Sequence, residues 1–424
     1  MNIQAANRST AAEAALVEAY TAQLGDLPGD GAVLGARDIL FDDLKRAGLP
    51  TRRVEAWHYT DLKTLLRAIP DTATLTPSKA VAPLVEAARI FELRQGLSRD
   101  VSAPDGVKVR AYSESLVDGT AAADLVAFSK DDAIGRINGS FVRDGYRLSV
   151  EDNVEVDRLI ELQAYQGGGQ SHSRFVASFG TGSKATVIER HRNSGETAGL
   201  ISSVSDLDLG EGAEVTWIIV QTQGLADTHL GQIKVVLGTN AKLKLFVINA
   251  GGKLVRQEIH VRTAGEGSDF TLRAVNLLGG ESHTDVTMTL GHDVPNTTST
   301  EVIRNVVFDR ARGVFQGQIR VAPDAQKTDA RMACNTLLMS DDAEYSVKPE
   351  LEIFADDVQC AHGATVADID HNHLYYLMAR GIPQKVARGL LIKAFVAELV
   401  EELEDEELVE ALEGVISDWL ETHG

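Results

Sequence analysis

Gly180-Thr181-Gly182-Ser183-Lys184-Ala185 is a glycine-led turn that opens into a short run of alternating apolar and polar residues. Four clear copies of this pattern follow one another at intervals of 30, 28 and 27 residues, starting at Gly180, Gly210, Gly238 and Gly265. A weaker copy begins at Gly291. In one copy Asn240 replaces the second glycine, which suits a backbone position with a positive φ angle. A fixed period in this range predicts a solenoid, in which each repeat stacks on the previous one and buries a continuous core.

The repeated units carry strand patterns and no helical pattern. From about residue 108 to residue 355 we expect no helix, and apolar residues recur in short runs, namely 154–162, 185–189, 215–220, 233–237, 243–248 and 270–278. Each unit has room for two or three short strands, which is the length of one coil of a β-helix. Many short strands also fit a sandwich or a barrel, but the regular spacing favours the β-helix.

Helical patterns lie at the two ends of the chain. Residues 9–24 are predicted to form a helix with an apolar stripe, and Ser9 or Thr10 can cap its start. Residues 35–47 fit a second helix. Near the C-terminus, 383–404 and 405–422 follow the three-, four- and seven-residue spacing of amphipathic helices.

Three domains follow from these patterns. We expect an N-terminal helical and mixed region at 1–106, a β-helix core at 107–365 and a C-terminal helical domain at 366–424. In the N-terminal region, Trp57 and Tyr59 are expected to pack against a neighbouring helix.

Composition restricts the partners of the chain. The 424 residues include 62 acidic and 41 basic ones, and the formal charge of −21 would repel nucleic acids and anionic membranes. Two cysteines cannot form a disulfide framework and suit a reducing compartment. Residues 1–24 lack the basic start and apolar core of a signal peptide, and no stretch reaches the ~20 apolar residues of a membrane helix. We therefore expect a cytoplasmic protein.

Cys360 and His362 are the candidate ligands of this chain. Leu351 to Phe354 is predicted to be a strand, and a chain extended through His362 would place Val358, Cys360 and His362 on one face before Gly363 ends the run. A thiolate and an imidazole bind iron or zinc, but two ligands are fewer than the four of a closed site. The residues therefore allow either half of a shared metal site or structural packing.

Motifs of several enzyme classes are missing. The sequence contains no GxxxxGK[ST] phosphate loop, GxSxG, HExxH or CxxC, and without a phosphate loop we expect no nucleotide hydrolysis by this chain. Cys334 is expected to be a small buried hydrophobic residue. The His371-Asn372-His373 segment is expected to be exposed and polar.

Two segments resemble the SufB/SufD family of iron–sulfur cluster assembly proteins. The C-terminal signature consists of Lys348-Pro349-Glu350-Leu351-Glu352-Ile353, Asp356-Asp357-Val358, Cys360-Ala361-His362-Gly363-Ala364-Thr365, Tyr375-Tyr376-Leu377 and Arg380-Gly381-Ile382. The N-terminal block is Arg53-Val54-Glu55-Ala56-Trp57-His58-Tyr59-Thr60, in which the family more often has lysine in place of His58. Ala333-Cys334-Asn335 departs from the family, which more often has small polar residues before the asparagine. The short chain with few cysteines resembles the SufD branch more than the SufB branch.

This resemblance implies a fold and a function. The fold would be mainly β: a right-handed parallel β-helix (solenoid) core between an N-terminal helical region and a C-terminal helical domain. The function would be that of a non-enzymatic scaffold subunit. It would pair with a SufB-like paralogue through the end of the β-helix and dock a SufC-like ABC ATPase through the C-terminal helices.

The resemblance also implies the site residues. His362 would face a cysteine of the SufB-like subunit at a shared nascent iron–sulfur site, with Cys360 beside it. Leu391, Phe395 and Leu399 would lie on the helix that meets the ATPase. No cofactor would be bound stably by this chain alone; a transient iron–sulfur cluster would form at the interface of the complex, and the isolated chain could form a homodimer.

Three other functions are weaker. A β-helix enzyme that acts on polysaccharides would need clustered carboxylates and aromatic residues for sugar stacking, yet aromatic residues make up only 5% of the chain. A SufB-like subunit that supplies most of the cluster ligands is disfavoured by the presence of only two cysteines. A flavin could bind the assembled complex, but no residue of this chain points to it.

Overall fold

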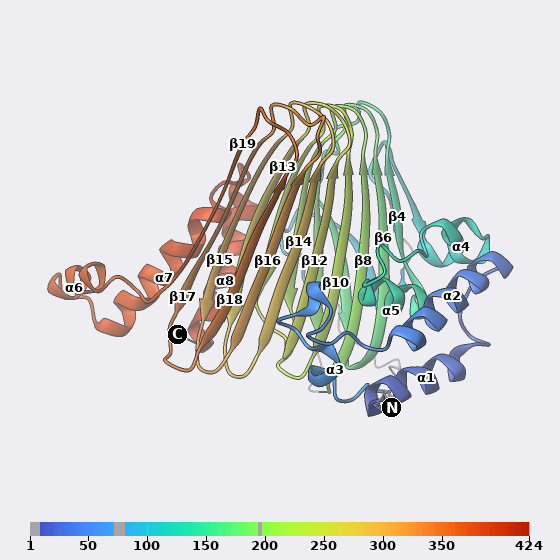
Figure 1. The fold of residues 1–424 in the computed structure, drawn as a ribbon, viewed down its shortest axis with the longest axis horizontal. Coiled ribbons are helices and arrows are strands. Elements are labelled where there is room, and N and C mark those ends of the chain that lie inside the picture. The colour runs from blue at the N-terminus through green and yellow to red at the C-terminus, as the bar shows by residue number, and fades with distance from the viewer. Residues whose placement is uncertain (1–8, 72–80, 100, 194–196, 424) are drawn as a thin grey trace, which may run out of the picture.

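The computed structural model describes residues 9–71, 81–99, 101–193 and 197–423. It is a solenoid of two long sheets, with helices of the N-terminal region on one side and those of the C-terminal region on the other (Figure 1). Each turn of the solenoid adds one strand to each sheet, so strands that neighbour each other in a sheet alternate in sequence order. The predicted mainly β solenoid with helical ends is thus confirmed.

Sheet A has nine strands, in the order β18 (Glu344–Ile353), β16 (Arg312–Val321), β14 (His283–His292), β12 (Leu254–Thr263), β10 (Thr228–Leu237), β8 (Gly199–Leu209), β6 (Gly169–Phe179), β4 (Asp144–Val150) and β3 (Val107–Ala111). Sheet B has ten strands, in the order β19 (Gln359–Ala367), β17 (Asp329–Leu338), β15 (Thr298–Val307), β13 (Asp269–Leu278), β11 (Lys242–Asn249), β9 (Glu214–Thr222), β7 (Lys184–Asn193), β5 (Ile160–Gln166), β1 (Arg89–Arg94) and β2 (Leu97–Ser98). All pairs are parallel except β1 with β2 and β3 with β4.

Alternating side chains of the two sheets fill the interior of the solenoid. In β11, Leu243, Leu245 and Val247 belong to the apolar interior between the sheets. Phe246 and Ile248 of the same strand are also buried, because the C-terminal helices cover the outer face of sheet B. Strands buried on both faces are typical of parallel sheets, which explains why this run is almost continuously apolar.

The glycine-led turns connect sheet A to sheet B in successive turns of the solenoid. Their third residues have left-handed backbones with φ between 54° and 73°, at Gly182, Gly212, Asn240 and Gly267. The weaker copy was placed wrongly at Gly291, which lies inside β14. The left-handed residue of that turn is Asn296, with a φ of 56°. The error arose because Val294 stands where the other copies have their first glycine, so the start of this turn is not marked in the sequence.

The N-terminal region contains α1 (Ala11–Gln23), α2 (Gly31–Ala47), the 3-10 helix η1 (Glu55–Trp57) and α3 (Leu62–Leu65). Thr10 and Glu13 form a reciprocal capping box at the start of α1. Trp57 is buried in an apolar cluster with residues of α1 and α2, as predicted, whereas Tyr59 is half-buried beside His58 and lies outside that cluster.

The prediction of no helix between 108 and 355 was wrong at three places. These are α4 (Tyr112–Val117), the 3-10 helix η2 (Thr120–Ala123) and α5 (Ala133–Phe141). The residues of α5 are all buried, between α2 and the outer face of sheet A. α5 spans only nine residues, and two of them are glycines, which are poor helix formers, so the sequence did not suggest a helix there.

The C-terminal region contains α6 (His371–Ala379), α7 (Gln384–Val400) and α8 (Glu406–His423). α7 and α8 pack on apolar residues of the outer face of sheet B, while α6 extends away from the solenoid (Figure 1). β1 and β2, which precede residue 107, also join sheet B. Within the described residues, no helix is both long enough and apolar enough to cross a membrane.

Candidate functional site

The solenoid ends at β18 and β19, which we call the open end. In the part of the chain that the structure describes, no further strand pairs with either of them. Seven residues of β19 in succession, from Ala361 to Ala367, are exposed. At the other end of the solenoid, antiparallel β2 and β3 close the two sheets. An exposed edge presents free backbone donors and acceptors, which makes the open end suited to pairing with another chain.

Cys360 and His362 both lie on β19 at the open end. In the register of sheet B, Cys360 pairs with Ala330 and His362 with Met332, and both partners belong to the buried interior. Alternation along a strand therefore places the two side chains on the same face, above the interior. Cys360 is half-buried against that interior, and His362 is exposed.

The backbone around this pair differs from the prediction. The chain turns at 354–358 between β18 and β19, so Val358 lies before the strand that carries Cys360. Gly363 does not end the run, because β19 continues to Ala367. Cys360 and His362 nevertheless lie on the same face, as predicted, because both belong to β19.

The pair alone is an incomplete metal site. Burial raises the pKa of the Cys360 thiol, which disfavours the thiolate that iron prefers. No group of three or more histidine, cysteine or carboxylate residues that could hold a metal ion was found among the described residues. A complete site would need further ligands, and a positive charge or a metal to stabilise the thiolate, beyond those that the described residues gather here.

Cys334 is buried in the interior below the open end, as predicted. Its sulfur lies 3.4 Å from Asn305 Nδ2 and 3.8 Å from the Tyr345 hydroxyl. Burial raises the pKa of its thiol to about 11. Cys334 is therefore a neutral thiol packed inside the solenoid.

Glu301 is an ionisable interior residue that sequence reasoning missed. It pairs with Met332, which in turn pairs with His362, so Glu301 lies two strands from His362 in sheet B, and its side chain is fully buried. Among the described residues neither carboxyl oxygen makes a hydrogen bond of normal geometry, and burial, opposed by the nearby Ser299 hydroxyl, raises the pKa of Glu301 to about 8. In the sequence Thr300-Glu301-Val302, the glutamate looks like an ordinary outward-facing strand residue.

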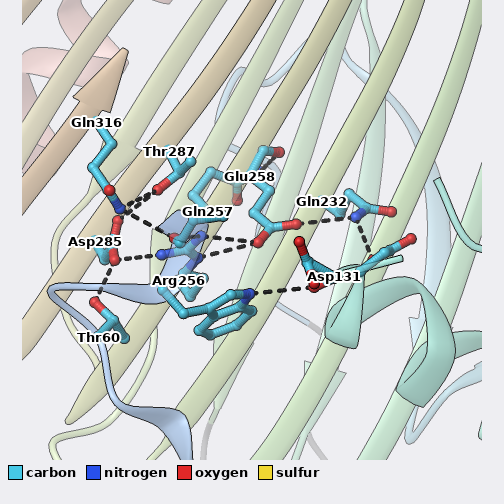
Figure 2. Close-up of polar contacts among 12 residues, drawn as sticks. Thr60, Asp131, Gln232, Arg256, Gln257, Glu258, Asp285, Thr287 and Gln316 are labelled. Atoms are coloured by element: carbon cyan, nitrogen blue, oxygen red, sulfur yellow. Dashed lines mark hydrogen bonds and ion pairs between the residues drawn. The ribbon is translucent and has the colours of Figure 1, made fainter. Parts of the chain in front are cut away.

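The N-terminal block is anchored on the outer face of sheet A by a buried polar network (Figure 2). The Arg256 guanidinium lies 4.1 Å from the ring centroid of Trp57 and donates to the Ala56 carbonyl at 2.7 Å. Arg256 also contacts the carboxylates of Asp285 and Glu258. Burial alone would raise the pKa of Glu258, but the charge of Arg256 lowers it to about 2.

The network continues on both sides of Arg256. Thr60 donates to Asp285, and Gln316 donates to the Ala56 carbonyl at 3.2 Å. Gln232 donates to Glu258 at 3.1 Å and to Asp132 at 2.9 Å (Figure 2). Buried charges are tolerated only when they are paired and hydrogen-bonded. These contacts therefore hold the N-terminal block in one position on sheet A.

This anchor brings the two sequence signatures together. Lys348 of β18 contacts Glu55 of the N-terminal block and lies 3.2 Å from Glu350. The N-terminal block therefore reaches the open end, although 293 residues separate Glu55 from Lys348.

The three residues predicted to meet a partner ATPase all pack against the solenoid. Leu399 is only 2% exposed, and Leu391 and Phe395 are half-buried on the same apolar cluster. The Arg304 guanidinium lies 4.5 Å from the Phe395 ring centroid. Their contact with a partner stays a prediction, and for Leu399 it would require α7 to leave the sheet. The exposed apolar side chains of this region are others: Tyr375, Tyr376, Met378, Val386 and Leu390.

Comparisons with known proteins point to iron–sulfur assembly. Residues 162–395, more than half of the chain, match the family described as "SUF system FeS cluster assembly, SufBD core domain". The iron-sulfur cluster assembly protein SufD of Escherichia coli is 28% identical over 389 residues, which cover 87% of this chain and 88% of that protein. A SufBD family protein of Synechocystis is 32% identical over 47% of this chain and 44% of its own length. The chloroplastic protein ABCI7 of Arabidopsis thaliana is 25% identical over 88% of this chain and 83% of its own length.

Replacing Arg256 with methionine should destabilise the fold and release the N-terminal block. The variant leaves two buried carboxylates without their cation, which typically costs about 3–5 kcal/mol. Urea unfolding measures the loss, and limited proteolysis between residues 50 and 60 measures the release. Arg262→Met, on the same strand with a side chain that is 60% exposed, is the matched control and should change stability by less than ~0.5 kcal/mol. Equal effects of the two variants would contradict the anchoring role.

Glu301→Gln should flatten the dependence of stability on pH. The pKa of Glu301 is about 8 in the folded chain, against a reference value of 4.5. Between these pH values the unfolded chain has released the proton and the folded chain holds it, so the free energy of unfolding falls as pH rises. The stability of the variant relative to that of the wild type should therefore increase progressively from about pH 4.5 to pH 8.

Urea unfolding at several pH values tests this expectation. Glu211→Gln, at an exposed turn position, controls for the loss of a surface carboxylate. A difference between Glu301→Gln and the wild type that does not change with pH would show that Glu301 does not titrate in this range.

Proposed function

Because the chain belongs to the SufB/SufD family of iron–sulfur cluster assembly proteins, we propose that it is a SufD-like scaffold subunit of a SufBCD-type complex. It pairs with a SufB-like paralogue through the open end and docks a SufC-like ABC ATPase through the C-terminal helices. It carries no reaction of its own, and nucleotide hydrolysis belongs to the ATPase. We expect the complex to work in the cytoplasm, in keeping with two free cysteines.

The observation that carries this proposal is the open end with Cys360 and His362 on its last strand. A solenoid grows by adding strands in register, and a second solenoid can continue both sheets from β18 and β19. The exposed side chains of β19 would then be covered by the partner. The two candidate ligands would lie directly at the junction.

This arrangement accounts for the incomplete metal site. Iron–sulfur clusters are held by several thiolate or imidazole ligands, and this chain offers two. A cysteine of the SufB-like subunit facing His362 would supply a further ligand, and bound iron would hold the Cys360 thiol in its deprotonated form. The cluster is then cargo that forms at the interface and leaves it, and no cofactor remains bound to this chain alone. The same open end allows a homodimer when the partner is absent.

The exposed apolar side chains of α6 and α7 support an ATPase site. Val386 and Leu390 line a groove with Phe308 and Leu420 at the outer side of α7 and α8. Tyr375 is 74% exposed on α6, which extends from the solenoid (Figure 1). Exposed apolar residues gathered on two neighbouring helices are typical of a protein-binding surface.

His362→Ala should abolish cluster formation in cells while the fold and the complex remain intact. His362 is exposed, so its loss should change stability by less than ~0.5 kcal/mol. Iron and acid-labile sulfide in the purified complex measure the cluster. Cys360→Ser should have a milder effect, because the half-buried side chain also packs against the interior.

The exposed His373→Ala on α6 is the matched control and should retain the cluster. Growth of the His362→Ala strain at the wild-type rate under iron limitation, with no second assembly pathway, would reject the role of His362.

Leu390→Glu and Tyr375→Glu should remove the ATPase from the complex without unfolding the chain. Both side chains are substantially exposed, so the charges stay in water in the free chain but would be desolvated on docking. Pull-down of the ATPase by the tagged chain, in the absence of the SufB-like subunit, is the measurement. Val117→Glu on α4, 64% exposed, is the control.

Undiminished recovery of the ATPase by both variants would place docking elsewhere. Deleting α7 and α8 is a poorer experiment, because it uncovers Ile218, Phe246 and Val275 on the outer face of sheet B.

A further inference from the structure

The row of left-handed turn residues ends in an exception. In successive turns this position is occupied by glycine or asparagine, at Asn153, Gly182, Gly212, Asn240, Gly267 and Asn296, but in the turn between β16 and β17, the last but one, it is Lys327, with a φ of 64°. Glycine and asparagine adopt this conformation readily, whereas a lysine adopts it at a cost. A residue held against its backbone preference at one place in a regular row indicates that its side chain has a task.

Lys327 contacts Asp357 in two ways, and its neighbour adds a third contact. The backbone N–H of Lys327 donates to the Asp357 carbonyl at 2.6 Å, and the Lys327 ammonium pairs with the Asp357 carboxylate. The N–H of Asp357 donates to Gln326 Oε1 at 2.9 Å. We call these three contacts the clasp.

The clasp holds the turn from which the candidate site strand starts. Asp357 belongs to the turn at 354–358, and Cys360 and His362 follow it by three and five residues. Within residues 9–71, 81–99, 101–193 and 197–423, β19 pairs with β17 on one side only, so no second described strand holds its start. The first ladder bond after the clasp runs from the Gln359 N–H to the Thr328 carbonyl at 2.8 Å.

The presence of a lysine at this left-handed position is not explained by a contribution to the stability of the whole fold. The two charged side chains are 61% and 65% exposed, and ion pairs of this kind contribute little to folding. The clasp therefore acts locally, on the start of β19.

We propose that Lys327 and Asp357 are positioning residues that fix the start of β19, and thereby set Cys360 and His362 against the partner subunit. This inference rests on the function proposed above, because it gives the clasp the task of orienting the shared cluster ligands. The side chains of Lys327 and Asp357 do not themselves ligate the cluster.

Hydrogen exchange and cluster yield of three full-chain variants test the clasp. Lys327→Asn removes the ammonium and leaves a residue that favours the left-handed backbone, and Asp357→Asn removes the carboxylate at constant size. The exchange of amides in 354–367 should become up to about fivefold faster, the ratio expected for an exposed ion pair, while the unfolding midpoint stays unchanged. Cluster yield in the complex with the SufB-like and ATPase subunits should fall. The double exchange Lys327→Asp with Asp357→Lys should restore both readouts.

Unchanged exchange in 354–367 for Lys327→Asn and Asp357→Asn would overturn the inference. Faster exchange with full cluster yield would overturn it too, since the clasp would then not matter for the site. A failure of the proposed function would be detected separately, because the His362→Ala variant would then give full cluster yield. The exchange measurement is made on the isolated chain and does not depend on the proposed function.

Discussion

In-register stacking of one solenoid turn on the next is the constraint on which the rest of the structure depends. Every parallel pair from β4 to β19 keeps a continuous ladder, and the left-handed residues of the connecting turns form a row of their own. This stacking satisfies the backbone of each turn only when another turn follows it. At each end of the solenoid, the outer backbone groups of the last turn therefore need a partner other than a further turn. Antiparallel β2 and β3 occupy one end, and β18 and β19 stand open at the other.

The helices outside the solenoid are fixed by different physics. The C-terminal helices α7 and α8 cover apolar side chains on sheet B, a contact driven by burial of apolar surface. The N-terminal block is instead held on sheet A by the buried charges around Arg256, which tolerate little displacement. Through Glu55 and Lys348 this rigid contact extends to the open end. Both flanking regions thus support the solenoid behind the open end, and the ion pair of Glu55 with Lys348 reaches the last strand of sheet A.

The sequence predicted the solenoid because glycine and asparagine at left-handed positions are visible in the residue pattern. It failed where another residue took that position, as at Lys327, or where the first glycine of the repeat was missing, as at Val294 before Asn296. Cys360 and His362 were placed on one face, but the turn before β19 was missed, because Asp356 and Asp357 carry no glycine or proline to mark it. Glu301 could not be found, since one glutamate in a polar strand looks the same whether it points inward or outward. Leu399 was chosen from an apolar stripe that serves packing on sheet B.

Hydrogen exchange of the chain with and without a SufB-like subunit tests most directly whether the open end is the interface. Peptides that cover β18 and β19, residues 344–367, should become strongly protected in the complex, since their free backbone groups would pair with the partner solenoid. Peptides from β8 and β10, in the middle of the solenoid, should not change. Protection that leaves 344–367 untouched and falls on another surface would contradict the account.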